Sequence, residues 1–175
     1  MADGNLDETT TKNLRDGALT ITDGTGVPNT ITVPFVDGDF SWSRKQNVIA
    51  VFDRGTFSHF RQGDQELVTW SFTCKYNQLY SQNGDDESAY EALWQEENAS
   101  AWTTVTDGDA NETDVYCVDL ELTVTNAKDA ATETMKIEEA VILDSSFAEG
   151  DEYNTLSMSG IAGCVAPTVG GAAAP

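Results

Sequence analysis

Basic residues, histidine and long apolar runs are scarce in this chain of 175 residues, and each scarcity excludes a class of function. Nine Lys and Arg stand against thirty Asp and Glu, giving a net charge of −21 that disfavours binding to nucleic acid phosphates. The chain has one histidine, His59, so few residues are suited to acid–base catalysis or to a zinc site. No apolar run approaches the length of a membrane helix.

Cysteine is also rare. Cys74, Cys117 and Cys164 are odd in number, widely separated and not arranged as a CxxC pair, which predicts reduced, buried thiols and no disulfide frame. The first residues, "MADGNLDETTTKN", have neither the positive start nor the apolar centre of a signal peptide. We therefore expect the chain to be made and used in a cytosol, or in a particle assembled there.

Catalytic motifs are missing as well. Ser58 and His59 lie near Asp53 and Asp64 in the sequence, but neighbours along one segment do not converge as a catalytic triad does, and no GxSxG motif occurs. The acidic stretch 107–114 does not fit the calcium-binding pattern of an EF-hand. We predict no enzyme activity, no cofactor and no metal site.

What the sequence does contain is a pattern of β-strands. Within 66–76, Val68, Trp70, Phe72 and Cys74 alternate with polar residues, as in a strand with one buried face. Asp23-Gly24 separates two β-branched runs and predicts a hairpin. Further strands are expected in 37–43, 115–125, 134–147 and 154–163.

One segment follows a helical period instead. It predicts a helix over 86–98, with Asp85 or Asp86 as its cap and with Tyr90, Leu93 and Trp94 packed on the sheet. The predicted fold class is mainly β, an antiparallel β-sandwich or barrel with one flanking α-helix. The domain is expected to span 17–164, between a flexible N-terminal arm, 1–16, and a flexible C-terminal tail, 165–175.

The hairpin and the segment after it resemble the N-terminal half of the major tail tube proteins of long-tailed, siphovirus-like bacteriophages. In that family a "DGT…P…ITV" hairpin is followed by a long connection with Asp-Arg-Gly and Arg-x-Gly-Asp, and then by a strand with alternating aromatics. The matching residues here are Asp23, Gly24, Thr25, Pro28, Asp53, Arg54, Gly55, Arg61, Gly63, Asp64, Trp70 and Phe72.

The resemblance implies a structural virion protein. Members of the family form hexameric rings whose sheets join into a β-barrel, and the rings stack into the tail tube through which the genome is ejected. The implied partners are further copies of the chain, the tape-measure protein, the tail terminator and the distal tail proteins. Viral DNA would pass through without specific binding, and no membrane, cofactor or enzyme activity is implied. The implied location is the virion tail, assembled in the host cytoplasm.

Segment 44–64 gathers nearly half of the positive charge of this acidic chain, and we interpret it as a long assembly loop. Arginine and aromatic residues are typical of interface hot spots. In the alternative interpretation the segment folds back on its own sheet and its arginines pair with its aspartates. The expected subunit-interface residues are Arg44, Lys45, Phe52, Asp53, Arg54, Phe57, Phe60, Arg61 and Asp64.

A tube that conducts DNA gains from a bore that repels phosphates. Asp119 and Glu121 alternate with apolar residues on one predicted strand, and Glu138 lies on the next. These three are the candidates for the lumen, with an ordinary solvated outer face as the alternative. High acidity is also typical of proteins from salty habitats, so a marine or halophilic host is compatible with the same charge.

Two other classes of protein remain open from the sequence. One is a different virion structural protein, such as a capsid decoration or head–tail joining protein. The other is a monomeric carbohydrate-binding β-sandwich, with Trp42, Trp70, Trp94 and Trp102 as a sugar platform, although Trp70 and Trp94 occupy positions that favour the core.

Overall fold

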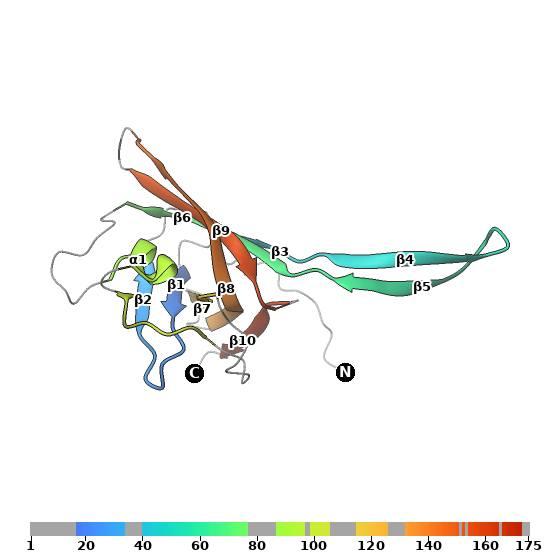
Figure 1. Cartoon of the computed structure of the whole chain (residues 1–175), viewed down its shortest axis with the longest axis horizontal. Coiled ribbons are helices and arrows are strands. Elements are labelled where there is room, and N and C mark those ends of the chain that lie inside the picture. Colours follow the sequence, from blue (N-terminus) through green and yellow to red (C-terminus); the bar gives the residue numbers. More distant parts are fainter. Residues whose placement is uncertain are drawn as a thin grey trace.

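The chain folds into a β-sheet body from which a long two-stranded arm projects (Figure 1). The computed structural model describes residues 17–33, 40–76, 87–96, 99–105, 115–125, 132–150, 152, 154–164 and 166–172. The predicted N-terminal arm, 1–16, lies outside these ranges. Within the described ranges, no helix has the length and apolar character needed to cross a membrane.

The body is one antiparallel sheet, which confirms the mainly β fold class. Its strands follow the order β2-β1-β7-β8-β9-β6-β3, and β10 also pairs with β8. No pairing between β2 and β3 closes the described strands into a barrel. The strand bounds are β1 (Gly17–Thr22), β2 (Thr30–Val33), β3 (Ser41–Ser43), β6 (Val68–Lys75), β7 (Val118–Thr125), β8 (Thr132–Ala148), β9 (Thr155–Ala162) and β10 (Thr168–Ala172).

The 17-residue strand β8 organises the sheet. β7 follows one edge of it, while β9 and then β10 follow the other, because Ala140 pairs with both Val118 and Ala162 and Lys136 pairs with Thr168. The C-terminal segment expected to be a flexible tail thus contains a strand. Small residues such as Gly170 and Gly171 do not form the alternating apolar pattern that predicts a strand. Strand β10 is therefore evident only from its pairing with β8.

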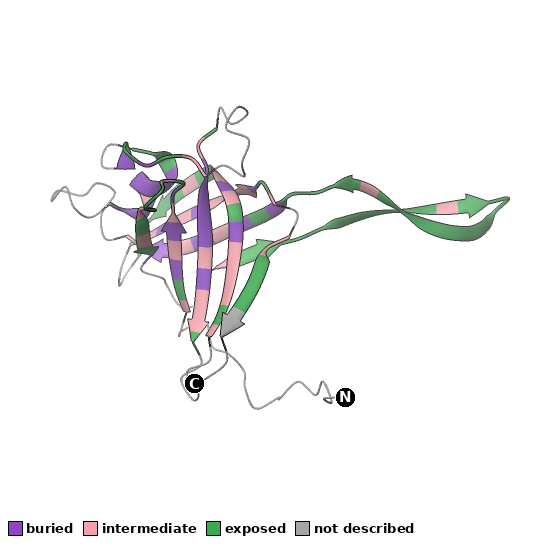
Figure 2. Ribbon diagram, turned by 90° about the horizontal axis from the view of Figure 1, so that it is seen from below, coloured by how far each residue is buried: buried purple, intermediate pink, exposed green. Residues whose placement is uncertain are grey.

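Alternation along the strands builds the core. Strand β6 buries Val68, Trp70, Phe72 and Cys74, as its period of two predicts. Leu156 and its alternate neighbours on β9 meet them from the adjoining strand, and Figure 2 shows buried and less buried residues alternating along the sheet. The largest fully buried side chains are Trp102, Phe72, Leu19, Ile21, Leu93, Leu120, Ile137, Met158, Glu91, Val68 and Val118.

The helix α1 (Ala89–Trp94) is shorter than the predicted 86–98. It begins at Ser88, whose hydroxyl accepts a hydrogen bond from the backbone N–H of Glu91, while the Glu91 carboxylate accepts one from the N–H of Ser88. It ends because Gln95 adopts a left-handed backbone, with φ of 54°. The predicted caps Asp85 and Asp86 lie outside the described residues.

The prediction of which helix residues pack on the core is only partly correct. Leu93 is buried and Tyr90 packs against the core cluster, as predicted. The prediction that Trp94 packs on the sheet is wrong. Trp94 is 38% exposed, because the helix ends at this residue. α1 contacts β1, β2 and β8 and so lies over one end of the body (Figure 1).

The predicted hairpin at Asp23-Gly24 is confirmed and holds a buried carboxylate. Asp23 is only 3% exposed and accepts hydrogen bonds from Thr25, Asn29 and the backbone N–H of Thr103. Burial acts to raise its pKa, but these hydrogen bonds outweigh burial and lower the pKa below the ordinary value of 3.8. Gly24 is required here, because a Cβ would collide with the carbonyl of Thr104. The loop is thereby tied to the segment 99–105.

The arm, defined here as residues 44–65, is a β-hairpin instead of the predicted long loop. Strands β4 (Gln46–Asp53) and β5 (Thr56–Gln65) pair antiparallel and continue the β3–β6 pair outward from the body. The tip is a two-residue turn in which Arg54 and Gly55 both have positive φ, 49° and 86°, as a type I′ turn requires. Figure 2 shows that the arm is exposed along almost its whole length.

Candidate assembly surface

One face of the arm is apolar. Phe52 lies directly opposite Phe57, and a register shift beside this pair brings Phe60 to the same face, so that the ring centroids lie 6.1 Å (Phe52–Phe57) and 4.8 Å (Phe57–Phe60) apart. The strand period places Val48 and Ala50 on that face too. We call these five residues the aromatic face. Its four large side chains are 47% to 68% exposed.

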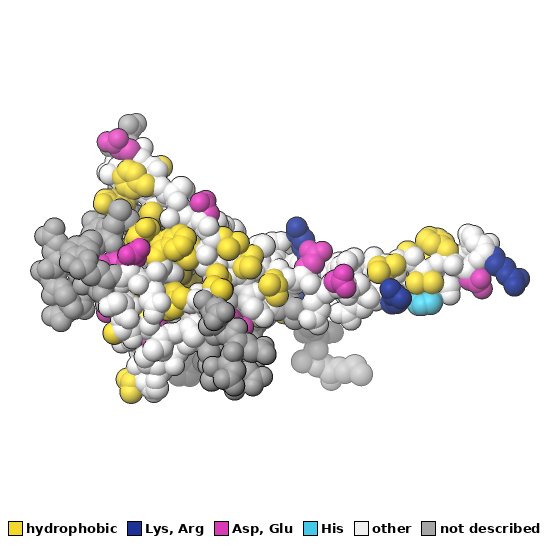
Figure 3. Space-filling model, viewed as in Figure 1, with side chains coloured by type: hydrophobic (Ala, Val, Ile, Leu, Met, Phe, Trp, Pro, Cys, Tyr) yellow, Lys and Arg dark blue, Asp and Glu magenta, His cyan; other side chains and the backbone are white. Residues whose placement is uncertain are grey.

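The other face and the tip carry the positive charge. His59 and Arg61 lie opposite Val51 and Ile49, and Arg54 occupies the turn (Figure 3). Within the described part of the chain, no ion pair joins either arginine to a carboxylate. The arm therefore does not lie on its own sheet with Arg54 and Arg61 paired to Asp53 and Asp64, as the alternative interpretation of segment 44–64 required.

The exposure of the arm indicates that another protein surface binds to it. An isolated two-stranded hairpin is marginally stable in water at best. Both outer edges of β4–β5 also lack a neighbouring strand among the described residues, and open edges pair readily with other chains. An apolar patch on an exposed hairpin is typical of an interaction surface. Five predicted interface residues thus lie on the exposed arm, with Phe52, Phe57 and Phe60 on one face, Arg61 on the other and Arg54 at the tip.

Arg44, Lys45, Asp53 and Asp64 complete the predicted interface set at other points of the arm. Arg44, Lys45 and Asp64 line a small pocket at its base, and Asp53 precedes the turn. The structure therefore divides the predicted set into a distal group, which holds the phenylalanines, Arg61 and the tip residues Asp53 and Arg54, and a basal group of Arg44, Lys45 and Asp64.

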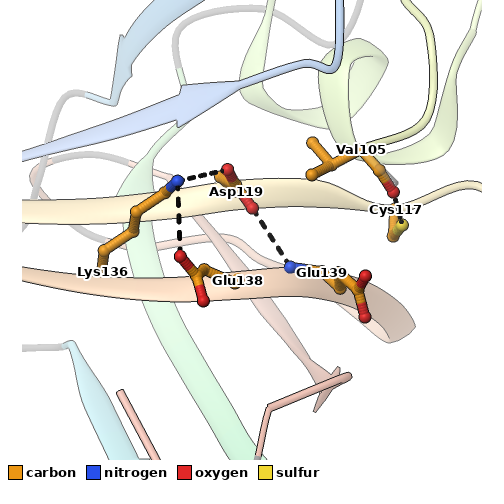
Figure 4. A network of polar contacts seen from close by, with 6 residues as sticks. All are labelled: Val105, Cys117, Asp119, Lys136, Glu138 and Glu139. Carbon is orange, nitrogen blue, oxygen red and sulfur yellow. Dashed lines mark hydrogen bonds and ion pairs between the residues drawn. The ribbon is translucent and has the colours of Figure 1, made fainter. Parts of the chain in front are cut away.

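The three lumen candidates share the polar face of β7 and β8, but they are not equally exposed. Asp119 is 8% exposed and accepts a hydrogen bond from the backbone N–H of Glu139, at the bulge where Glu139 has φ of 53°. Lys136 Nζ lies 2.7 Å from Asp119 and 3.7 Å from Glu138 (Figure 4). The hydrogen bond to Asp119 raises the pKa of Lys136, against the lowering effect of burial.

This network changes the charge of the face. Glu121 pairs in register with Lys136 across the strands, so one ammonium lies among three carboxylates. Hydroxyl side chains occupy much of the same face, including Thr20, which donates a hydrogen bond to the carbonyl of Glu121. The surface is polar and hydroxylated, and its carboxylates are partly neutralised.

The tryptophans do not form a sugar platform. Trp70 and Trp102 are each 2% exposed and belong to the core, where Trp70 stacks with Phe72 and donates a hydrogen bond to the carbonyl of Ile161. Trp42 is 42% exposed at the root of the arm, and Trp94 lies on α1. Aromatic rings that line a sugar site must be exposed on one surface, and two of these four are not.

Few reactive side chains lie close together among the described residues. Ser58 Oγ and His59 Nδ1 lie 3.1 Å apart on the exposed arm, and no described carboxylate is hydrogen-bonded to that ring. In the described part of the chain, no three His, Cys, Asp or Glu residues gather as metal ligands; the acidic stretch 107–114 is outside it. Cys74 and Cys117 are buried thiols, and burial raises the pKa of Cys74 to about 11. Cys164 is half-buried.

No protein-family profile and no curated protein sequence matches this chain. Solved structures do. The cryo-EM structure of the anti-feeding prophage cap, described as the tube-terminating cap of that particle, superposes with a TM-score of 0.59 at 13% identity, covering 98% of this chain and 100% of that one. A chain of the six-fold symmetrised anti-feeding prophage baseplate matches at a TM-score of 0.45 and 7% identity, covering 99% of each, which is too low to support an argument. The first likeness shows a shared fold.

A groove beside the arm was not predictable from the sequence pattern. Strands β3, β6 and β9, with Leu143 of β8, line a shallow groove of about 400 Å³ at the root of the arm. Leu143 is 59% exposed at a bulge of β8, between Ile142 and Asp144. The apolar run 140–143 could have indicated an apolar surface in this strand. Which of its residues is exposed, however, depends on the bulge.

Proposed function

We propose that this chain is a structural subunit of a phage tail or a related tail-like particle, and that it polymerises as stacked hexameric rings into a tube. The observation that carries the proposal is the arm, which leaves an aromatic face and two open strand edges in water. Contacts between different surfaces of identical subunits close into rings or continue as filaments. In the assembled particle the arm reaches an adjacent subunit or ring.

Fold and charge support the same function. The fold is shared with a protein described as a tube-terminating cap. The chain carries −21, and identical acidic subunits repel one another unless local positive charge lies at their contacts. The arm supplies Arg44, Lys45, Arg54 and Arg61 against Asp53 and Asp64, so the arm is net +2 and the rest of the chain −23.

We further propose that the polar face of β7 and β8 lines the bore. Asp119, Glu121 and Glu138 would then face a conduit through which DNA passes without specific binding. Threonine hydroxyls and carboxylates do not bind phosphates tightly. The cation on this face, Lys136, is already paired with Asp119. A tape-measure protein, a tail terminator and distal tail proteins are the partners that such a tube requires.

A second function is favoured by the match to the cap: the chain could form a single ring that ends a tube of another protein. The two functions differ in what the purified chain does alone. We expect rings that stack into hollow tubes of uniform width when the protein is viewed by negative-stain electron microscopy at low and high salt. Single rings that never stack would favour the cap, and monomers under all conditions would contradict both.

The arginines of the arm test the role of its charge. Replacing Arg54 and Arg61 together by alanine should stop tube growth while leaving a folded monomer, because the two cations lie on the exposed distal arm. Growth is followed by light scattering and microscopy, and folding by circular dichroism. Lys75→Ala, which removes a cation from the body strand β6, is the control and should still polymerise. Normal tubes from the double variant would contradict the proposal.

A further inference from the structure

The groove at the root of the arm has the size and lining to receive aromatic side chains. Its volume is about 400 Å³, and an apolar cavity of about 150 Å³ is enough for one benzene ring. Its exposed apolar residues are Trp42, at 42%, and Leu143, at 59%, with small serines along the strands. Gly160 contributes backbone alone to the groove.

The arm of the same molecule cannot fill this groove. Trp42 is in β3, which leads directly into β4, so the groove lies where the arm begins. Phe60 pairs with Ala50, eight positions beyond Trp42, and at ~3.3 Å per residue that register lies about 26 Å away along an extended strand. A paired hairpin is too stiff to return over that distance without breaking its own ladder.

We propose that the aromatic face of one copy docks in the root groove of a second copy of this chain. This inference rests on the proposed self-assembly and names the surface that receives the arm. The donor surface is Phe52, Phe57 and Phe60, and the acceptor surface is Trp42 and Leu143 with the backbone of Gly160.

Charge supports a second copy as the occupant. The arm is net +2, whereas the rest of the chain is −23, so the body of another copy attracts the arm from a distance. The exposed Asp144 directly follows Leu143 beside the groove, where a cation flanking the docked phenylalanines finds a carboxylate. A basic or neutral partner would lack this attraction.

The geometry predicts a head-to-tail assembly. Each copy carries the donor near the end of its arm and the acceptor at its root, so one contact leaves a free donor on one copy and a free acceptor on the other. Successive copies are then offset by about the distance from the groove to Phe60 along the arm, roughly 26 Å. Such a contact closes into a ring or propagates along a filament.

A complementation experiment tests the two surfaces separately. The donor variant is Phe57→Ser with Phe60→Ser, and the acceptor variant is Leu143→Arg; all three side chains are at least 48% exposed, so both chains should fold. Each variant alone should remain monomeric, while an equimolar mixture should give dimers and nothing larger, measured by analytical ultracentrifugation. Val27→Arg, which changes an 86% exposed valine in the β1–β2 loop, is the control and should assemble like the unmodified protein.

Cross-linking locates the contact directly. Phe60→Cys and Leu143→Cys are prepared in separate chains, mixed and oxidised, with the unmodified chain as the control for Cys74, Cys117 and Cys164. A disulfide-linked dimer should form only in the mixture that carries both new thiols. Tubes that grow normally from Leu143→Arg, or no cross-link within assembled tubes, would overturn the groove contact and leave tube formation standing. An unmodified chain that stays monomeric at every salt and concentration would overturn both.

Discussion

The arm and the β3–β6 pair of the body are formed by the same two chain segments, but their surroundings are opposite. β3 runs on into β4, and β5 runs on into β6, so the same two segments pair once in the sheet of the body and again in the separate two-stranded sheet of the arm. In the body, Phe72 of β6 is 1% exposed, whereas Phe57 and Phe60 of β5 are 48% and 68% exposed. Both halves have strand-forming residues with apolar side chains on one face. They differ only in whether something covers that face.

That difference separates stability from assembly. Side chains in the body are buried in the monomer and contribute to its free energy of unfolding. The same kind of side chain on the arm contributes little until a partner buries it. The arm is therefore expected to be the part of the molecule where substitutions change association without changing the fold, and the body the part where they do the reverse.

Phenylalanine substitutions on each side of this boundary give the largest contrast. Phe72→Ala should lower the free energy of unfolding by about 3–5 kcal/mol, because it leaves a cavity in the core. Phe57→Ala should lower it by about 1 kcal/mol or less, the scale of an aromatic pair on a surface, yet it should abolish assembly. Urea denaturation at concentrations where the chain is monomeric measures both. Equal losses of stability would show that the arm is packed in the monomer.

The carboxylate of Asp23 tests the body away from the arm. Asp23→Ala should cost about 2–4 kcal/mol of unfolding free energy, because it leaves buried donors of the loop unpaired. Since the folded pKa lies below 3.8, the stabilisation is present above that value and is lost as the pH falls through the folded pKa. The stability difference between the unmodified protein and Asp23→Asn should thus be constant from neutral to mildly acidic pH and shrink in strong acid. A pH-independent difference would contradict this origin.

The ion pair of the polar face gives the smallest effect. Lys136→Met should change the unfolding free energy by at most about 1 kcal/mol, because the ammonium is partly solvated. The raised folded pKa means that the contribution is present below the ordinary value of 10.5 and is lost as the pH rises through the folded pKa. A double-mutant cycle with Asp119→Asn isolates the coupling. A coupling near zero at neutral pH would show that Asp119 is held by the backbone of Glu139 alone.

Much of the body was predictable from local patterns. The period of two in 66–76 and the turn at Asp23-Gly24 both define elements that need no knowledge of their neighbours. The helix was predicted in the right place but too long, since Gln95 is not a residue that usually ends helices by a left-handed backbone. Strand β10 was missed because its glycines and small residues form a strand only through pairing with β8.

The candidate site was predictable in its composition and less so in its shape. Arginines and phenylalanines near Asp53-Arg54-Gly55 indicated an interface, but period counting did not indicate a hairpin there. The register shift between Val51 and Phe52 is what brings Phe60 onto the same face as Phe57. A bulge adds one residue to one strand, and nothing in the local sequence specifies that it occurs there.

The amino-acid sequence by itself determined the strand class, the acidic surface, the scarcity of catalytic groups and the concentration of cations in one segment, because composition and short-range periodicity are local properties. Only the tertiary structure decided that this segment projects as an arm, that Lys136 partly neutralises the polar face, and that Leu143 borders a groove at the root of the arm. Those outcomes depend on pairing between residues distant in the chain, and such pairings are set by the packing of the whole sheet.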